Sequence, residues 1–201
     1  MAKPVRNKQS YIDAAIAVIR DEGFESLSMR KVAAKLGVSA MAMYKHFPNK
    51  DALLSSALDD FIGRADVLPD EDIDWDVWVA EVARRMFLAL SEEIDWVPLL
   101  GALGAGEQAA KVTAQFIEKL RHAGFTSVQA TDAYFALIQC VIGAACLQVS
   151  LRAEKQGLLK GASVKPPAKA GSAAQRLQID ISMALIISAL RRQLDSPQPA
   201  S

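Results

Sequence analysis

Nineteen consecutive residues, Ala133 to Leu151, carry no charged side chain. That length is close to what a helix needs to cross a lipid bilayer. The run also contains the polar residues Gln139, Gln148 and Ser150, and no other run in the sequence resembles it. A helix that is apolar on all sides is more often buried in a protein core or in a subunit interface. We therefore expect a buried helix here and no membrane insertion.

Helical periodicity extends along nearly the whole chain. Ile12, Ala15, Ile16 and Ile19, for example, follow the i, i+3, i+4, i+7 spacing of one helical face. Alternating strand patterns and Asn-Gly hairpin signals are absent from the sequence. The sequence therefore predicts an all-α protein. The expected helices span residues 8–21, 28–36, 40–46, 50–64, 75–91, 95–103, 106–123, 127–155 and 175–194.

Charge and composition divide the chain into two functional parts. The 23 basic and 23 acidic residues of the whole chain cancel. Residues 1–50, however, hold nine Lys and Arg against four Asp and Glu, a net charge of +5, and the remainder carries −5. We expect a helix-turn-helix head at 1–50, a linking helix at 51–66 and a helical body at 67–195. Within the body, the Gly-, Pro- and Lys-rich stretch 157–174 is expected to be a mobile loop, and 196–201 a disordered tail. A basic head on an acidic body favours a polyanion as the partner of the head.

The most informative segment runs from Ser28 to Phe47. Two short predicted helices, capped by Ser28 and Ser39, flank the turn Gly37-Val38-Ser39. The glycine allows the left-handed backbone with which a second helix crosses the first steeply. In a helix-turn-helix, the second helix enters the major groove of DNA and the first crosses the backbone.

The residue types in this segment suit DNA. An arginine in the position of Arg30 is able to make a bidentate contact to guanine. Ala40, Met41 and Ala42 offer apolar contact to thymine methyl groups and little hydrogen-bond readout. We expect these four residues at the bases. The expected phosphate contacts are Ser28, Lys31, Ser39, Tyr44, Lys45, His46 and Lys50.

This segment resembles the DNA-binding head of the tetracycline-repressor (TetR) family. The resemblance lies in Ser28–Leu36, Gly37-Val38-Ser39, the run Tyr44-Lys-His-Phe-Pro-Asn-Lys-Asp-Ala-Leu-Leu54 and the preceding Asp-Glu-Gly at 21–23. The resemblance implies that Tyr44, His46 and Lys50 hold phosphates. It also implies that Arg30, Ala40, Met41 and Ala42 lie at the bases.

The rest of the chain resembles the ligand-binding body of the repressor after which the family is named. This resemblance covers residues 75–101, 120–151 and 181–194. The resemblance implies that the helices 127–155 and 175–194 pack with those of a second copy as a four-helix bundle. Their apolar composition also fits a buried, obligate interface, since a lone protomer would expose a large apolar patch. The expected interface residues are Tyr134, Ile138, Ile142, Ile186 and Leu190.

The ligand of that repressor, a magnesium–drug chelate, is not expected here. An alignment by eye places Asp66, Val82, Leu99, Phe116 and Leu147 opposite the polar groups that hold the chelate. The single histidine of the body, His122, lies in a basic stretch typical of a surface. We therefore expect no metal and a hydrophobic or aromatic effector. The expected pocket residues are Trp78, Val82, Met86, Leu99, Leu103, Phe116 and Leu147, although apolar residues at helical spacing are usually plain core.

Cys140 and Cys146 lie six residues apart in the apolar run, a spacing that favours buried thiols in a reducing cytosol. The sequence holds no HExxH, GxSxG or Gly-rich phosphate loop, so neither an enzyme nor a cofactor is expected. The sequence thus predicts a cytoplasmic, homodimeric transcriptional regulator, and favours a repressor, released from a palindromic operator by a small molecule. Two alternatives stay open: a constitutive DNA-binding dimer, and a helical small-molecule-binding protein or enzyme with a vestigial head.

Overall fold

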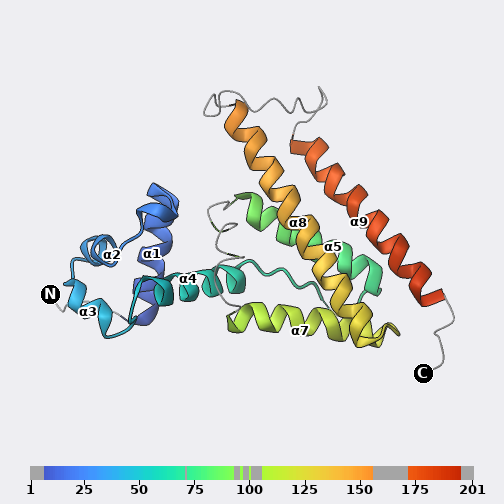
Figure 1. Cartoon of the computed structure of the whole chain (residues 1–201), viewed down its shortest axis with the longest axis horizontal. Coiled ribbons are helices and arrows are strands. Elements are labelled where there is room, and N and C mark those ends of the chain that lie inside the picture. Colours follow the sequence, from blue (N-terminus) through green and yellow to red (C-terminus); the bar gives the residue numbers. More distant parts are fainter. Residues whose placement is uncertain are drawn as a thin grey trace. The chain divides into compact units, whose positions relative to one another are not determined.

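A computed structural model of the chain describes residues 7–70, 72–92, 96, 100, 106–155 and 172–195, with the backbone alone for 149–155 and 172–178. The predicted all-α class is confirmed, because these residues form eight α-helices, one short 3-10 helix and no strand (Figure 1). The helices are α1 (Lys8–Glu22), α2 (Met29–Leu36), α3 (Ala40–Tyr44), α4 (Lys50–Arg64), α5 (Trp75–Glu92), α7 (Glu107–His122), α8 (Ser127–Lys155) and α9 (Ser172–Asp195).

Three sequence expectations fall wholly or partly outside the described residues. They are most of the helix expected at 95–103, the loop expected at 157–174 up to residue 171, and the tail 196–201. Residues 172–174, expected in the loop, instead form the first residues of α9.

The chain divides into two compact units. The head unit contains Met1–Arg64 and Asp95–Ala110, and the body unit contains Ala65–Ile94 and Lys111–Ser201. The expected boundaries had placed 95–110 in the body. Two contacts explain the difference. The ring of Trp96 stacks on Phe61 of α4 at 5.2 Å, and the backbone N–H of Gln108 donates to Asp59 of α4 over 2.8 Å.

The head unit has an apolar core formed by the inward faces of α1, α2 and α4. The predicted face of α1 is confirmed, since Ile12, Ala15, Ile16 and Ile19 are all buried. Met43 and Phe47, at and just after α3, fill the space between these helices and are almost completely buried. The short α3 is thereby held by its own buried side against a three-helix core.

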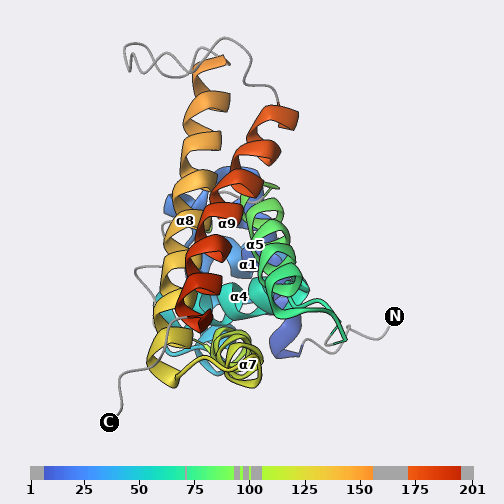
Figure 2. The ribbon, with the colours of Figure 1, turned by 90° about the vertical axis from the view of Figure 1, so that its right-hand side faces the viewer.

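The body unit is organised around α5, α8 and α9. Helix α5 contacts both α8 and α9, which lie side by side and run in opposite directions. Figure 2 shows the same pairing from the side. An ion pair between Asp76 of α5 and Arg191 of α9 adds to the apolar contacts. Each of these helices buries one face in the unit, and the opposite faces of α8 and α9 stay at the surface.

Candidate functional site

The turn between α2 and α3 has the geometry that the sequence predicts. Gly37 adopts φ 62° and ψ 40°, the left-handed conformation, directly after α2. The N–H of Val38 donates to the carbonyl of Ala33 over 2.9 Å, which closes the end of the helix. Ser28 and Ser39 cap α2 and α3, because their hydroxyl oxygens accept from the N–H groups of Lys31 and Ala42. Both serines are therefore structural caps, and each keeps a hydroxyl proton for one further hydrogen bond.

Helix α3 presents a small and largely apolar surface. It is five residues long, shorter than the expected 40–46, because Lys45 and His46 form a turn ahead of Pro48. Met41 is 75% exposed, whereas Met43 is fully buried. Ala40 and Ala42 are half-buried beside Met41. In this helix the side chain best placed to meet a groove is thus a flexible thioether with no hydrogen-bond donor.

Cationic and polar side chains surround this apolar surface. Arg30, Tyr44, Lys45 and His46 are exposed, and the His46 ring lies 4.9 Å from the buried ring of Tyr11. Lys50 is half-buried at the first position of α4, where Asn49 caps the helix by accepting from the N–H of Ala52. These positions are compatible with phosphate contacts.

One of the expected phosphate ligands already has a partner. Lys31 lies 2.6 Å from Glu22, and both side chains are close to half exposed. An exposed pair of this kind is worth less than about 1 kcal/mol, so a phosphate is able to replace the carboxylate. A similar pair joins Lys35 to Asp21. Both pairs link the end of α1 to α2.

A polar network ties α1 to α4 on another side of the head unit. The guanidinium of Arg64 contacts Asp13 and Asp60, and Gln9 donates to Asp60 over 2.8 Å. The hydrogen bond from Arg64 holds the pKa of Asp13 below its ordinary value. Gln9, Asp60 and Arg64 line a cleft of about 410 Å³ whose lining is mainly charged and polar. Because its lining is mainly charged and polar, the cleft is a poor match for the hydrophobic effector expected from the sequence.

Helix α4 also supports the start of α7 within the head unit. Asp59 accepts from the N–H of Gln108, as an acidic residue does at a helix N-terminus. A Cβ at Gly106 would clash with the side chain of Asp59, so a larger residue here would displace Asp59 from its bond to Gln108. The boundary between the two units falls just beyond, inside α7, between Ala110 and Lys111.

The interior of the body unit is aromatic where several predicted pocket residues meet. Trp78 and Val82 of α5 are buried with Phe116 of α7, and the rings of Trp78 and Phe116 are 5.7 Å apart. The ring of Tyr134 also packs against Phe116 at 5.4 Å, and its hydroxyl accepts from Thr113 over 2.8 Å. This cluster is apolar with one hydroxyl pair at its edge.

The remaining predicted pocket residues have other surroundings. Met86 is half-buried, and Leu99 and Leu103 lie outside the described residues. Leu147 is 65% exposed on the outer side of α8, so it does not line the interior of this protomer. Its neighbour Gln148 faces inward instead, 6% exposed, and accepts from the hydroxyl of Ser91 over 3.2 Å. Among the described residues, no group of three or more His, Cys, Asp or Glu is arranged to hold a metal ion.

An apolar outer face extends over α8 and α9. Its large exposed members are Val128, Phe135 and Leu147 of α8 and Ile181 and Leu185 of α9. Exposed Gly143 and Cys146 continue the face along α8. The opposite side of α8, from Ala130 through Leu137 to Ala145, is buried in the unit. Apolar side chains gathered on one face of two adjacent helices mark a surface for a partner.

The expected interface residues occupy the edges of this outer face. Ile138, Ile142 and Ile186 are half-buried. Tyr134 contacts Phe116 and Thr113 of its own chain, and Leu190 is buried in the unit, so neither is centred on the outer face. The sequence alone did not identify Phe135, Ile181 and Leu185, because a helix that is apolar all round does not reveal which side its own chain covers.

Helix α8 satisfies a test for a membrane span by length and composition. The stretch Ser127–Gln148 has a mean hydropathy of 1.6 over a window that is 28% buried, and it is the one such stretch in the described part of the chain. One side of this helix lies against α5 and α9, however, and Asp132 is exposed on the other. These contacts favour a partner protein over lipid as the cover of the outer face.

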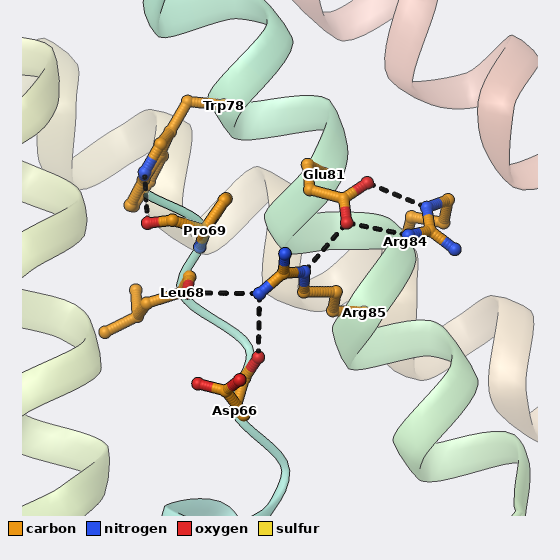
Figure 3. A network of polar contacts seen from close by, with 7 residues as sticks. All are labelled: Asp66, Leu68, Pro69, Trp78, Glu81, Arg84 and Arg85. Atoms are coloured by element: carbon orange, nitrogen blue, oxygen red, sulfur yellow. Dashed lines mark hydrogen bonds and ion pairs between the residues drawn. The ribbon is translucent and has the colours of Figure 1, made fainter. Parts of the chain in front are cut away.

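Helix α5 carries a cluster of charged side chains that was not among the residues predicted from the sequence. Glu81 accepts from Arg84 and Arg85, and Arg85 also donates to carbonyl oxygens of the segment before α5 (Figure 3). Hydrogen bonds from Arg84 and Arg85 lower the pKa of Glu81 to about 2. The i, i+3 and i, i+4 spacing of these charges was the available signal, but such spacing usually indicates a solvated helix face.

Comparison with known proteins agrees with this architecture. The family model for bacterial regulatory proteins of the tetR family matches residues 12–57, which span α1 to most of α4. Over 152 residues the chain is 31% identical to the tetracycline repressor protein class C of Escherichia coli. That match covers 74% of this chain and 69% of the repressor, so it extends well into the body unit.

Two solved structures share the whole fold. A TetR variant from Acinetobacter baumannii AYE in complex with minocycline has a TM-score of 0.77 at 24% identity, covering 95% of this chain and 99% of that one. BioQ with its double-stranded DNA operator has a TM-score of 0.69 at 24% identity, covering 93% and 99%. The helix-turn-helix geometry, the match to the family model and the identity to a repressor along most of the chain agree. The chain therefore belongs to the TetR family of bacterial regulatory proteins.

Proposed function

We propose that this protein is a cytoplasmic, homodimeric repressor that binds a palindromic operator and leaves it when a hydrophobic or aromatic small molecule binds the body unit. The observation that carries the proposal is the head unit. It presents exposed Met41 on a short, firmly seated helix, with exposed Arg30, Tyr44, Lys45 and His46 around it. In this scheme the bases are contacted by Arg30, Ala40, Met41 and Ala42. The phosphates are contacted by Ser28, Lys31, Ser39, Tyr44, Lys45, His46 and Lys50.

The outer face of α8 and α9 supports the dimer. A second copy of the chain would cover Phe135, Leu147, Ile181 and Leu185 with the same residues around a two-fold axis. A two-fold dimer of this kind places two recognition helices on successive turns of DNA, about 34–36 Å apart. A palindromic operator follows from that symmetry.

The aromatic interior of the body unit supports the class of effector. Trp78, Val82 and Phe116 are apolar and buried together, and Thr113 with Tyr134 adds one polar pair. These residues suit a ring system of low polarity better than a metal chelate. To release the operator, the effector has to bind the released conformer more tightly than the DNA-binding conformer. No step of this scheme is catalytic.

The deciding experiment is selection of bound sequences from random double-stranded DNA by the purified full chain at about 0.15 M salt, because non-specific binding is suppressed at that salt concentration. We expect enrichment of a two-fold palindrome. The recovered operator then serves as a labelled probe in a screen of aromatic compounds for release. A folded, dimeric protein that enriches no sequence would contradict the proposal. An operator from which no compound releases the protein would favour the constitutive DNA-binding dimer.

A further inference from the structure

The segment between α4 and α5 is held to α5 at three of its carbonyl oxygens. Arg85 Nη1 donates to the carbonyls of Asp66 and Leu68, each over 3.2 Å, and Trp78 Nε1 donates to the carbonyl of Pro69 over 3.3 Å (Figure 3). We call residues 65–70 the connector. The side chains of Val67 and Pro69 are buried, so the connector is fixed from both its backbone and its side chains. A flexible linker would leave these groups to water.

The first of these bonds stabilises an unusual backbone. Asp66, two residues after the end of α4, has a φ of 44°. The left-handed region costs a residue other than glycine roughly 1 kcal/mol, and such a conformation persists where neighbouring groups hold it. The guanidinium of Arg85 on the carbonyl of Asp66 is one such group. The path of the chain directly after α4 thus depends on a side chain of α5.

Arg85 is itself held in one orientation. Glu81, one turn earlier on α5, accepts from Arg85 Nε over 2.7 Å, which leaves Nη1 directed at the connector. Arg84 binds both oxygens of the same carboxylate, over 2.8 and 2.7 Å, but makes no contact with the connector. Arg84 and Arg85 therefore share the carboxylate of Glu81, but only Arg85 also donates to carbonyl oxygens of the connector.

Trp78 links the connector to the interior of the body unit. Its indole N–H holds the carbonyl of Pro69, while its ring, 3% exposed, packs against Phe116. A displacement of α5 or of the Trp78 ring therefore moves connector carbonyls with it. The connector follows α4 directly in the chain, and α4 begins with Lys50, an expected phosphate contact.

We propose that Arg85, oriented by Glu81, and Trp78 are positioning residues that hold the connector and thereby couple the body unit to the affinity of the head unit for its operator. The proposal rests on the proposed function. Breaking these contacts adds conformers in which the head units of a dimer are wrongly spaced. Operator affinity falls by the fraction of molecules that leave the binding-competent state.

The test compares Arg85→Met with Arg84→Met in the full-length chain. Both substitutions remove one guanidinium from Glu81, and only Arg85→Met removes the connector contacts. Using the operator recovered by selection, we expect Arg85→Met to weaken binding by about fivefold to tenfold, the lower range of allosteric couplings. Arg84→Met is expected to stay within about twofold of the wild type. The dependence of affinity on salt is expected to be the same for all three proteins, because no phosphate contact changes.

Amide hydrogen exchange supplies a readout that does not depend on DNA. We expect faster exchange at the amides of residues 65–68 and 70 in Arg85→Met and no change there in Arg84→Met, since Pro69 has no amide hydrogen. If Arg85→Met loses helix content, Trp78→Phe replaces it, since phenylalanine keeps a ring in the interior and removes the bond to Pro69. Equal operator affinity in the Arg85 and Arg84 variants would overturn the proposal, and so would unchanged exchange in the connector. A wild-type protein that selects no operator overturns the proposed function and the coupling together, whereas the exchange data still decide whether Arg85 holds the connector.

Discussion

In the head unit, the apolar side chains of α1, α2 and α4 turn toward a shared centre at Met43, Phe47 and Leu53, which leaves a surface of ion pairs and polar caps. In the body unit, α8 and α9 bury one apolar face against α5 and expose another, with Phe135 and Leu185 at the surface. The head unit thus satisfies its apolar residues within one chain. The body unit does so only in part.

This difference separates two kinds of stability. A core closed within the chain depends on its own packing, whereas an apolar face left exposed by the fold gains stability only by association, which depends on protein concentration. The two units should therefore respond differently to the same type of substitution.

The largest effect is expected at the outer face of the body unit. Phe135→Glu would place two carboxylates against an apolar two-fold interface, and unpaired buried charges cost several kcal/mol. We expect the dissociation constant of the dimer to rise by at least about 10,000-fold, or about 5.5 kcal/mol, measured by sedimentation equilibrium. Val77→Glu, at an exposed apolar position of α5 rather than of α8 or α9, is the matched control and should stay dimeric. A dimeric Phe135→Glu protein would assign the interface to another surface.

A smaller but still large effect is expected in the core of the head unit. Phe47 is 1% exposed, and Phe47→Ala in a packed core costs about 3–5 kcal/mol. We expect loss of exchange protection in α1 to α4 while the body unit keeps its protection and the dimer persists. Met41→Ala, at an exposed position of α3, should change stability by less than about 0.5 kcal/mol. Equal loss of protection in both units would mean that the two unfold as one.

The sequence predicted more of the head unit than of the body unit. The reason is again that the apolar residues of the head unit face one centre, whereas those of the body unit do not. In the head unit each helix has one apolar face and a clear cap, so the bounds of α4 and the buried face of α1 follow from spacing. In α8 the apolar residues surround the helix. The sequence predicts its bounds, 127–155, but does not distinguish Leu137, which is buried, from Leu147, which is exposed. That choice depends on where α5 and α9 lie, which is tertiary information.

The next effect concerns readout of DNA by the head unit. If Arg30 contacts a guanine, Arg30→Ala should cost roughly 1–3 kcal/mol and relax preference at one position of each half-site. Lys50→Ala, the comparison variant, should weaken binding to all sequences alike and reduce the salt slope by about one. Fluorescence anisotropy on the selected operator and on random DNA at several salt concentrations separates these outcomes. Identical behaviour of the two variants would contradict the division into base and phosphate contacts.

The smallest effect is a pH dependence centred on the body unit. Hydrogen bonds from Arg84 and Arg85 lower the pKa of Glu81 from an ordinary value of 4.5 to about 2. A lowered pKa in the folded state contributes stability above the ordinary value, and that contribution is lost as the pH falls from 4.5 to about 2. Denaturant unfolding across this range should show a shallower loss of free energy in Glu81→Gln than in the wild type. Parallel curves would mean that the carboxylate is equally charged in the folded and unfolded chains.

The contacts of Phe61 with Trp96 and of Asp59 with Gln108 bear on how such proteins exchange parts during evolution and in the laboratory. Grafting residues 1–64 onto a foreign body would remove the indole from Phe61 and the helix end from Asp59. A functional transplant has to carry Trp96, Gly106 and Gln108, or a body that already supplies their equivalents. The head unit is therefore discontinuous in the sequence, although it is compact in space.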